Sequence, residues 1–179
     1  MLKREINILF TAIMFYTLIP VPSNIGFSNE MLNKSTRYFS FIGIVVGGIA
    51  AALFWALQLI IPIPVAIILS MVTSIFITGA FHEDAFADFC DGFGRGYTPD
   101  KILEIMKDSR IGTYGAVGIV LMLFTKFIYL SNMLPSDIPL VLIGAHAFSR
   151  LVSVCLIHTS EYVRQDALSK SKPIGHKGS

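Results

Sequence analysis

The chain has 179 residues, of which 54% are hydrophobic and only 15% are charged, and its formal net charge is +2. Soluble domains typically carry about 25% charged residues, so this composition excludes an ordinary soluble globule. The small net charge, without a dense cluster of Lys and Arg, argues against binding of nucleic acid. The only two cysteines, Cys90 and Cys155, lie far apart, which argues against a disulfide framework or a zinc site.

The first apolar stretch, residues 5–19, is short and ends at Pro20-Val21-Pro22. Its length is marginal for a membrane span, so we expect an interfacial or re-entrant helix. The stretch has a basic start but lacks an Ala-x-Ala-like cleavage site, which argues against a removed signal peptide.

Four longer apolar blocks follow, and each is long enough, or nearly so, to cross roughly 30 Å of hydrocarbon. The first contains Gly43-x-x-x-Gly47, a spacing that lets two helix backbones approach closely in lipid. We therefore predict an all-α, polytopic membrane protein with about four transmembrane helices, forming one membrane-embedded domain over residues 1–179. The predicted spans are residues 38–60, 65–81, 111–131 and 138–158.

The distribution of basic residues predicts the orientation in the membrane. The turns near Pro62 and Pro135 contain no Lys or Arg. The opposite connections contain several, which places them, including the acidic segment 82–110, in the cytoplasm and the protein in the bacterial inner membrane. These basic residues are Lys34, Arg37, Arg95, Lys101, Lys107, Arg110, Arg164, Lys170 and Lys172.

The acidic segment 82–110 is the predicted functional region. Asp84, Asp88 and Asp91 have the spacing i, i+4, i+7, so a helix continuing from the preceding span to about Phe89 places them on one face. Three clustered carboxylates favour a divalent cation, and Mg²⁺ prefers carboxylate oxygen together with bound phosphate.

A second helix is predicted after Thr98, a candidate N-cap, with Pro99 in its first position. On it Glu104 and Asp108 have i, i+4 spacing, and the glycines between Asp91 and Tyr97 permit a sharp reversal. Two acidic faces can then close on one or two metal ions. The alternative is a solvated amphipathic loop, but the interleaved phenylalanines favour a metal site at the membrane surface; they are Phe81, Phe86, Phe89 and Phe93.

The last block carries Arg150 within an apolar segment. Insertion of such a charge costs at least about 2.5–3.5 kcal/mol, so Arg150 needs either an acid such as Asp84 or a substrate phosphate. We expect His146 and Ser149 to form hydrogen bonds between helices. For His82, a metal ligand, a proton shuttle and a helix-end histidine in contact with water all remain open.

Two central blocks of the sequence carry a specific pattern: they are His82-Glu83-Asp84-Ala85-Phe86-Ala87-Asp88-x-x-Asp91-Gly92 and Leu103-Glu104-Ile105-Met106-Lys107-Asp108-Ser109-Arg110-Ile111-Gly112-Thr113-Tyr114-Gly115. These blocks resemble the cobalamin synthase family, the adenosylcobinamide-GDP ribazoletransferases, and the resemblance extends from about residue 5 to about residue 165. Ala85 stands where the family usually has Gly, and we expect the chain to lack the family's C-terminal part.

The resemblance implies that adenosylcobinamide-GDP is joined to α-ribazole, or to α-ribazole phosphate, through the cobinamide-linked phosphate, with release of GMP. Mg²⁺ would be held by Asp84, Asp88 and Asp91, and its further candidate ligands are Glu83, Glu104 and Asp108. The candidate catalytic residues are Asp84, Asp88, Asp91, Arg110 and Arg150, and the candidate cofactor- or substrate-binding residues are Arg37, His82 and Arg95. Partners would be these substrates and membrane lipid, with no nucleic acid; a homo-oligomer is left open.

Three alternatives are weighed against this function. Asp88-x-x-Asp91-Gly92 is similar to the start of the CDP-alcohol phosphotransferase signature, whose remainder is not matched. A divalent-cation transporter subunit would need acids inside the spans, whereas here they cluster at the membrane edge. A non-catalytic scaffold leaves Arg150 and the aspartate stripe unexplained.

Overall fold

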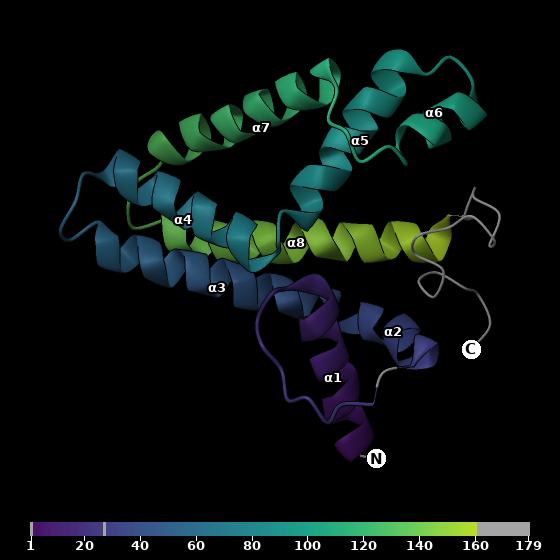
Figure 1. The fold of residues 1–179 in the computed structure, drawn as a ribbon. Coiled ribbons are helices and arrows are strands. Elements are labelled where there is room, and N and C mark those ends of the chain that lie inside the picture. The colour runs from purple at the N-terminus through teal and green to yellow at the C-terminus, as the bar shows by residue number, and fades with distance from the viewer. Residues whose placement is uncertain (1, 27, 161–179) are drawn as a thin grey trace.

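The computed structural model describes residues 2–26 and 28–160, which are helical and contain no strand (Figure 1). Arg164, Lys170 and Lys172, used above to predict orientation, lie outside these residues. The elements are α1 (Leu2–Tyr16), α2 (Asn29–Ser35), the short 3-10 helix η1 (Thr36–Tyr38), α3 (Phe39–Leu57), α4 (Ile63–Ile77), α5 (Phe81–Arg95), α6 (Pro99–Ile105), α7 (Thr113–Ser131) and α8 (Ile138–Thr159).

The described chain contains three helical stretches that are long and apolar enough to cross a membrane: Asn29–Leu57, Thr113–Ser131 and Ile138–Thr159. A fourth span is possible only if α4 and α5 count together, and these two helices meet at an angle of 87°. The prediction of a polytopic all-α membrane protein is therefore confirmed. At 15 residues, α1 is only about 22 Å long, in keeping with a helix that does not span.

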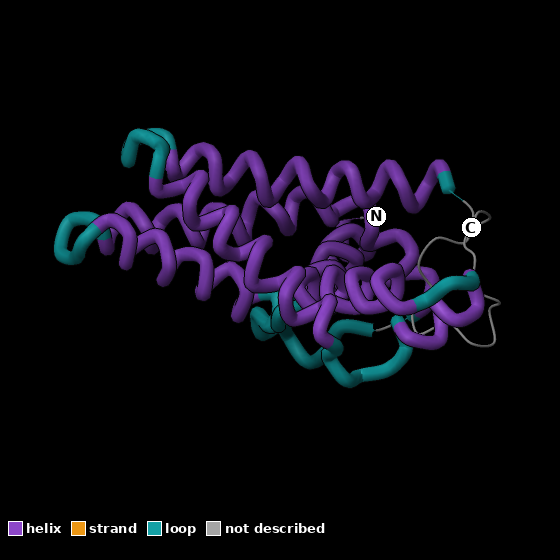
Figure 2. Tube along the Cα trace, turned by 90° about the horizontal axis from the view of Figure 1, so that it is seen from above, coloured by secondary structure: helices purple, strands orange, loops and turns teal. Residues whose placement is uncertain are grey.

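Helices α3 and α8 pack closely side by side (Figures 1 and 2). A Cβ atom added at Gly47 would lie 2.8 Å from Cα of Ile143, and one added at Gly43 would overlap the carbonyl oxygen of His146. Only glycine permits this approach of the two backbones, so the predicted packing role of Gly43 and Gly47 is confirmed, and its partner is the last span.

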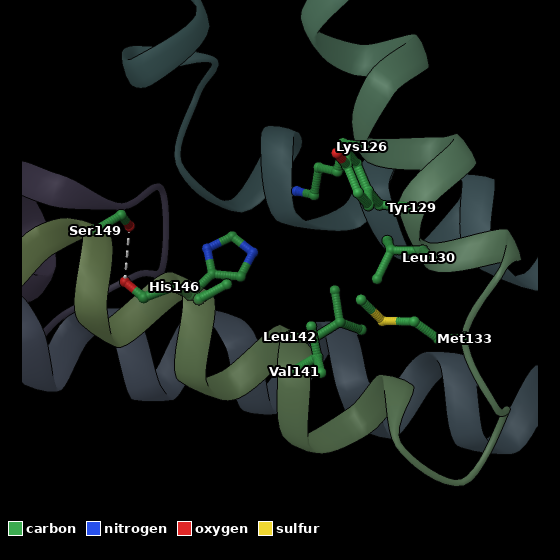
Figure 3. Close-up of a pocket in the computed structure, with 9 residues that line it drawn as sticks. Lys126, Tyr129, Leu130, Met133, Val141, Leu142, His146 and Ser149 are labelled. Carbon is green, nitrogen blue, oxygen red and sulfur yellow. Dashed lines mark hydrogen bonds between the residues drawn. The ribbon is translucent and has the colours of Figure 1, made fainter.

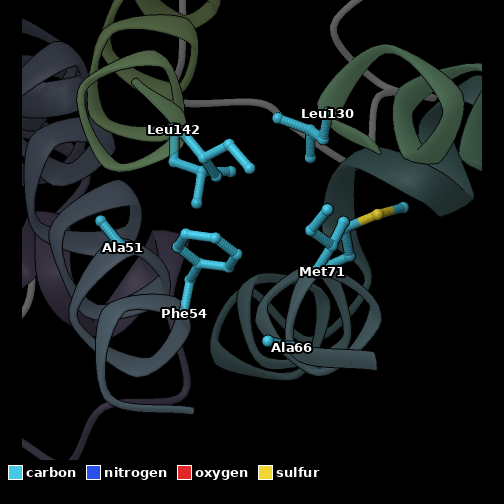
Figure 4. Close-up of a cluster of buried hydrophobic side chains, with 8 residues drawn as sticks. Ala51, Phe54, Ala66, Met71, Leu130 and Leu142 are labelled. Carbon is cyan, nitrogen blue, oxygen red and sulfur yellow. The ribbon is translucent and has the colours of Figure 1, made fainter. Parts of the chain in front are cut away.

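A buried apolar cluster joins four of the long helices (Figure 4). Phe54 of α3 is fully buried among side chains of α4, α7 and α8. This cluster ties the ends of α7 and α8 to the α3–α4 hairpin, beside the turn at Pro62. Its other buried members are Ala51, Ala66, Ile67, Met71, Leu130, Ile138 and Leu142.

The chain bends sharply between α4 and α5. The expectation that the helix continues through Phe81 is wrong, because Gly79 and Ala80 adopt left-handed backbone conformations with φ of 62° and 56°. A right-handed helix cannot pass through two such residues. The corner is fixed by the N–H of Leu18, which donates to the carbonyl of Ile77 over 2.7 Å. The acidic helix α5 thus starts within the helix bundle and runs away from it toward α6 (Figure 1).

Candidate functional site

Helix α5 carries the three predicted aspartates on one continuous helix, but their environments differ. Asp84 is exposed, Asp88 is half-buried, and Asp91 is only 4% exposed. The shared helix is thus confirmed, whereas the three carboxylates do not face a common open space.

Asp91 caps the start of α7. Its Oδ2 accepts from the N–H of Gly112 at 2.6 Å, and its Oδ1 accepts from the N–H of Gly115 at 3.0 Å. These N–H groups have no partner inside the helix, and the negative charge also suits the positive end of the helix dipole. A Cβ atom at Gly115 would lie 2.5 Å from Oδ2, so glycine is needed for this contact. Asp91 therefore joins α5 to α7, and its predicted metal-binding and catalytic role stays a prediction.

The predicted second acidic face does not form. Thr98 caps α6 as predicted, accepting from the N–H of Lys101 at 3.3 Å, but α6 ends at Ile105 and leaves Asp108 outside it. Glu104 instead pairs with Lys101 at 2.9 Å, and Asp108 pairs with Arg110 at 2.7 Å. Hydrogen bonds from Arg110 lower the pKa of Asp108 to about 2.

The reversal between the two helices also lies later than expected. Gly92 and Gly94 are inside α5, and the chain turns only after Arg95, through Gly96 and Tyr97. The turn is therefore made by Gly96 and Tyr97 rather than by the glycines inside α5.

The described residues contain no group of three or more His, Cys, Asp or Glu side chains arranged to hold a metal ion. Mg²⁺ does not require one, since it commonly takes one or two carboxylates and completes its shell with water and substrate phosphate. Asp84, which is exposed, and Asp88, which is half-buried, lie one helical turn apart on α5 and fit that mode. Metal binding by this pair stays a prediction.

A second group of polar side chains lies between α5, α7 and α8. Arg150 is 2% exposed, and its Nη1 donates to the carbonyl of His146 at 2.9 Å and contacts Nδ1 of the same residue at 3.1 Å. Its guanidinium also lies 5.7 Å from the centre of the Phe39 ring. The acid that interacts with it electrostatically is Glu83, rather than the expected Asp84.

Lys126 of α7 faces this group and was missed from the sequence. Glu83 also interacts electrostatically with Lys126, and Lys126 with His146. The available signal was a single Lys inside an otherwise apolar 19-residue helix, which is costly in a membrane and therefore informative. We call His82, Glu83, Lys126, His146 and Arg150 the polar cluster.

Several buried atoms of the polar cluster have no hydrogen-bond partner among the described residues. Leaving a buried polar atom unpaired costs about 1–3 kcal/mol, so this concentration is unusual. The unpaired atoms are Nε2 of His82, Oε2 of Glu83, Nε2 of His146, and Nε and Nη2 of Arg150.

The structure shows the surroundings of both histidines. His82 is the second residue of α5 and is partly exposed, while its ring packs against Phe39 and Phe81 and its Nε2 is buried. The hydroxyl of Ser149 donates to the carbonyl of His146 over 3.2 Å, within α8. The hydrogen bonds of His146 and Ser149 that the described residues show thus stay inside one helix.

A cavity of about 250 Å³ opens between α7 and α8 next to the polar cluster (Figure 3). Lys126, His146 and Ser149 line one end of it, and apolar side chains such as Leu130 and Met133 line the other. The space therefore offers a cationic end and an apolar end to a bound molecule.

The other predicted basic residues lie apart from this cavity. Arg37 forms an ion pair with Glu5, which also accepts from the hydroxyl of Tyr38 at 2.9 Å, so Arg37 fastens α1 to η1. Arg95 is exposed at the end of α5, and Arg110 is exposed beside its partner Asp108. The structure therefore separates the basic residues that the sequence grouped together.

Comparison with known proteins identifies the family. Residues 8–177 match the sequence profile of cobalamin-5-phosphate synthase. Proteins named adenosylcobinamide-GDP ribazoletransferase from Shewanella frigidimarina, Shewanella oneidensis and Vibrio parahaemolyticus are 46%, 44% and 43% identical to this chain. The alignments cover 96%, 98% and 99% of this chain and 67%, 68% and 68% of those relatives. No solved structure is significantly similar. The chain, which spans about two thirds of the length of these relatives, belongs to the cobalamin-5-phosphate synthase family.

Proposed function

We propose that this chain is a membrane-embedded phosphotransferase that joins adenosylcobinamide-GDP to α-ribazole or α-ribazole phosphate. The products would be adenosylcobalamin or its phosphate, together with GMP. Family membership supports this activity, since the relatives carry the name adenosylcobinamide-GDP ribazoletransferase. The structural observation that carries the proposal is the spacing of Asp84 and Asp88 one helical turn apart on α5, next to Glu83, which interacts electrostatically with Lys126 and Arg150.

The reaction breaks one phosphoanhydride bond and forms one phosphoester bond. A ribose hydroxyl of α-ribazole attacks the phosphorus linked to cobinamide, GMP leaves with the bonding electrons, and the hydroxyl proton passes to a base. Such transfers depend mainly on positioning and on stabilising charge at the phosphate oxygens. Because both oxygens of Asp91 accept backbone N–H groups, we favour Asp84 or Asp88 as the carboxylate that accepts the proton.

Mg²⁺, bound by Asp84 and Asp88, would neutralise charge on the diphosphate of the substrate. The residues of the chain would hold and orient the phosphate groups around it. Arg150 is preorganised for this, because its buried guanidinium has two nitrogen atoms without partners among the described residues. Arg95 and Arg110, exposed near the ends of α5 and α6, are suited to guide the anionic substrate toward the site.

The proposed location is the bacterial inner membrane, with α5 and α6 on the cytoplasmic side. The connections predicted to face the cytoplasm carry the basic residues, whereas the turns near Pro62 and Pro135 carry none. A site on that side would be reached by water-soluble nucleotide substrates.

The test is transfer activity of the detergent-solubilised protein, measured as GMP release and corrinoid product with Mg²⁺ and with EDTA. Product that depends on both Mg²⁺ and α-ribazole supports the proposal. If the 179-residue chain is inactive, the same assay is run on this chain extended by the C-terminal third of the Shewanella frigidimarina relative. An extended chain that is folded and also inactive would contradict the proposal.

A further inference from the structure

The polar cluster presents mostly hydrogen-bond donors. A guanidinium can only donate, so Nδ1 of His146 accepts from Arg150 and, in the neutral ring, the proton is carried by Nε2. The unpaired atoms therefore include three N–H donor positions, at Nε and Nη2 of Arg150 and Nε2 of His146. Lys126 adds an ammonium group, which is also only a donor. A ligand for this cluster must be rich in acceptors.

The charges of the cluster point the same way. Lys126 and Arg150 come from two different helices, and the acid that interacts with both is Glu83. Among the described residues, Lys126, Glu83 and Arg150 have no oppositely charged side chain within the 4.0 Å N···O distance of an ion pair. Two cations and one anion leave one positive charge uncompensated inside a helical membrane protein, where such charges are costly.

The geometry also leaves room for a ligand. Lys126 and His146 face the same cavity of about 250 Å³ from opposite helices, and Ser149 lies beside His146 (Figure 3). Arg150, one turn after His146 in α8, is connected to this cavity wall through its hydrogen bond to the ring of His146. Lys126 and His146 thus face one end of an existing space, and Arg150 adjoins it through His146.

We propose that the polar cluster is a binding site for a phosphate-type oxyanion, held between Lys126 of α7 and Arg150 of α8. His146 donates a further hydrogen bond through Nε2, and Glu83 is a positioning residue that keeps the two cations from repelling each other in the unliganded protein. The oxyanion contacts neither Asp84 nor Asp88, and its binding to the polar cluster needs no metal. Identification of the oxyanion as a phosphate of the transferase substrate rests on the function proposed above; a lipid phosphate offers the same chemistry.

Thermal unfolding of the detergent-solubilised chain in EDTA tests the site without metal and without turnover. Sodium pyrophosphate is added, and sodium chloride at matched ionic strength is the reference. We expect pyrophosphate to raise the Tm of the wild type and of Lys126→Arg, which keeps the charge. Lys126→Met should bind pyrophosphate at least about tenfold more weakly than the wild type, because one charge-assisted contact is lost. Lys34→Met is the matched control and should respond like the wild type, since Lys34 pairs with Glu30 near α1.

A second arm distinguishes the source of the phosphate. Phosphatidylglycerol is added to the micelles, with diacylglycerol as the phosphate-free control. A Lys126-dependent rise in Tm with pyrophosphate supports a soluble phosphate ligand. A Lys126-dependent rise in Tm with phosphatidylglycerol alone supports the oxyanion site but overturns the assignment of the oxyanion to the transferase substrate. No response to either probe, or an equal response in Lys126→Met, overturns the site itself. Because neither arm measures transfer, an inactive chain with an intact response would count against the proposed reaction alone.

Discussion

Two buried charged regions of this protein differ in how many of their polar atoms have hydrogen-bond partners. At the junction of α5 and α7, both oxygens of Asp91 accept backbone N–H groups, and glycine at 115 permits the contact. In the polar cluster, Arg150 is equally buried, but its Nε and Nη2 have no partner among the described residues. A completed set of hydrogen bonds is typical of a joint that holds the fold, whereas an incomplete one indicates a place kept for a ligand.

The largest effect on stability is expected from Asp91→Ala. The change leaves the N–H groups of Gly112 and Gly115 without an acceptor, at about 1–3 kcal/mol for each that stays buried. Thermal unfolding in detergent should show a clear fall in Tm. Asp84→Ala, on the exposed part of the same helix, is the control and should change Tm little; equal losses in both variants would remove the distinction between the two aspartates.

Gly115→Ala tests the same junction of α5 and α7 by steric overlap, without changing a charge. The added Cβ would lie 2.5 Å from Oδ2 of Asp91 and 3.0 Å from the carbonyl of Ala87, and such overpacking typically costs about 1–3 kcal/mol. The matched control is Gly144→Ala, where no atom lies within 4 Å of the new Cβ and helix propensity predicts a small gain. Stability measurements that rank the two variants in the opposite order would be incompatible with the packing described here.

Glu83→Gln perturbs the polar cluster without removing its shape. Lys126 and Arg150 lose their shared counter-charge, so we expect a destabilisation of about 1 kcal/mol, the scale of an ion interaction over several ångströms in a partly hydrated site. Pyrophosphate should offset this loss, because an oxyanion replaces the missing charge. A Glu83→Gln variant whose Tm is unchanged by pyrophosphate would speak against the cluster as an anion site.

The smallest effect is expected at the exposed pair of Asp108 and Arg110. Arg110 lowers the pKa of Asp108 from 3.8 to about 2, so the stabilisation is present above the unfolded-state pKa and is lost as the pH falls toward 2. Asp108→Asn should therefore leave the Tm at neutral pH almost unchanged, because exposed pairs contribute little. A large loss of Tm at pH 7 would show that the Asp108 loop has a structural role that its exposure does not suggest.

Sequence reasoning predicted the apolar helices, the close packing at Gly43 and Gly47 and the cap at Thr98, because each follows from local chemistry. It could not predict the bend at Gly79 and Ala80, since a left-handed Ala is set by contacts with the segment after α1. For the same reason, helical spacing grouped Asp91 with Asp84 and Asp88, although its partners lie 21 and 24 residues further along the chain.

The polar cluster illustrates the same limit. Arg150 was recognisable as a charge in need of a partner, but the helix supplying Lys126 could be assigned only from the fold. The electrostatic interaction of these two cations with Glu83, in place of Asp84, likewise depends on the direction in which α5 leaves the bend.

The most direct test of the account compares the turnover of Asp88→Asn and Asp91→Asn, measured as GMP release per folded molecule in an active, Mg²⁺-supplemented preparation. The account predicts that Asp88→Asn loses about 100-fold or more, as expected when a group acting on the reacting phosphate is removed. Asp91→Asn should retain near wild-type turnover once its lower folded fraction is taken into account. Loss of turnover in folded Asp91→Asn, with Asp88→Asn still active, would contradict the division of roles along α5.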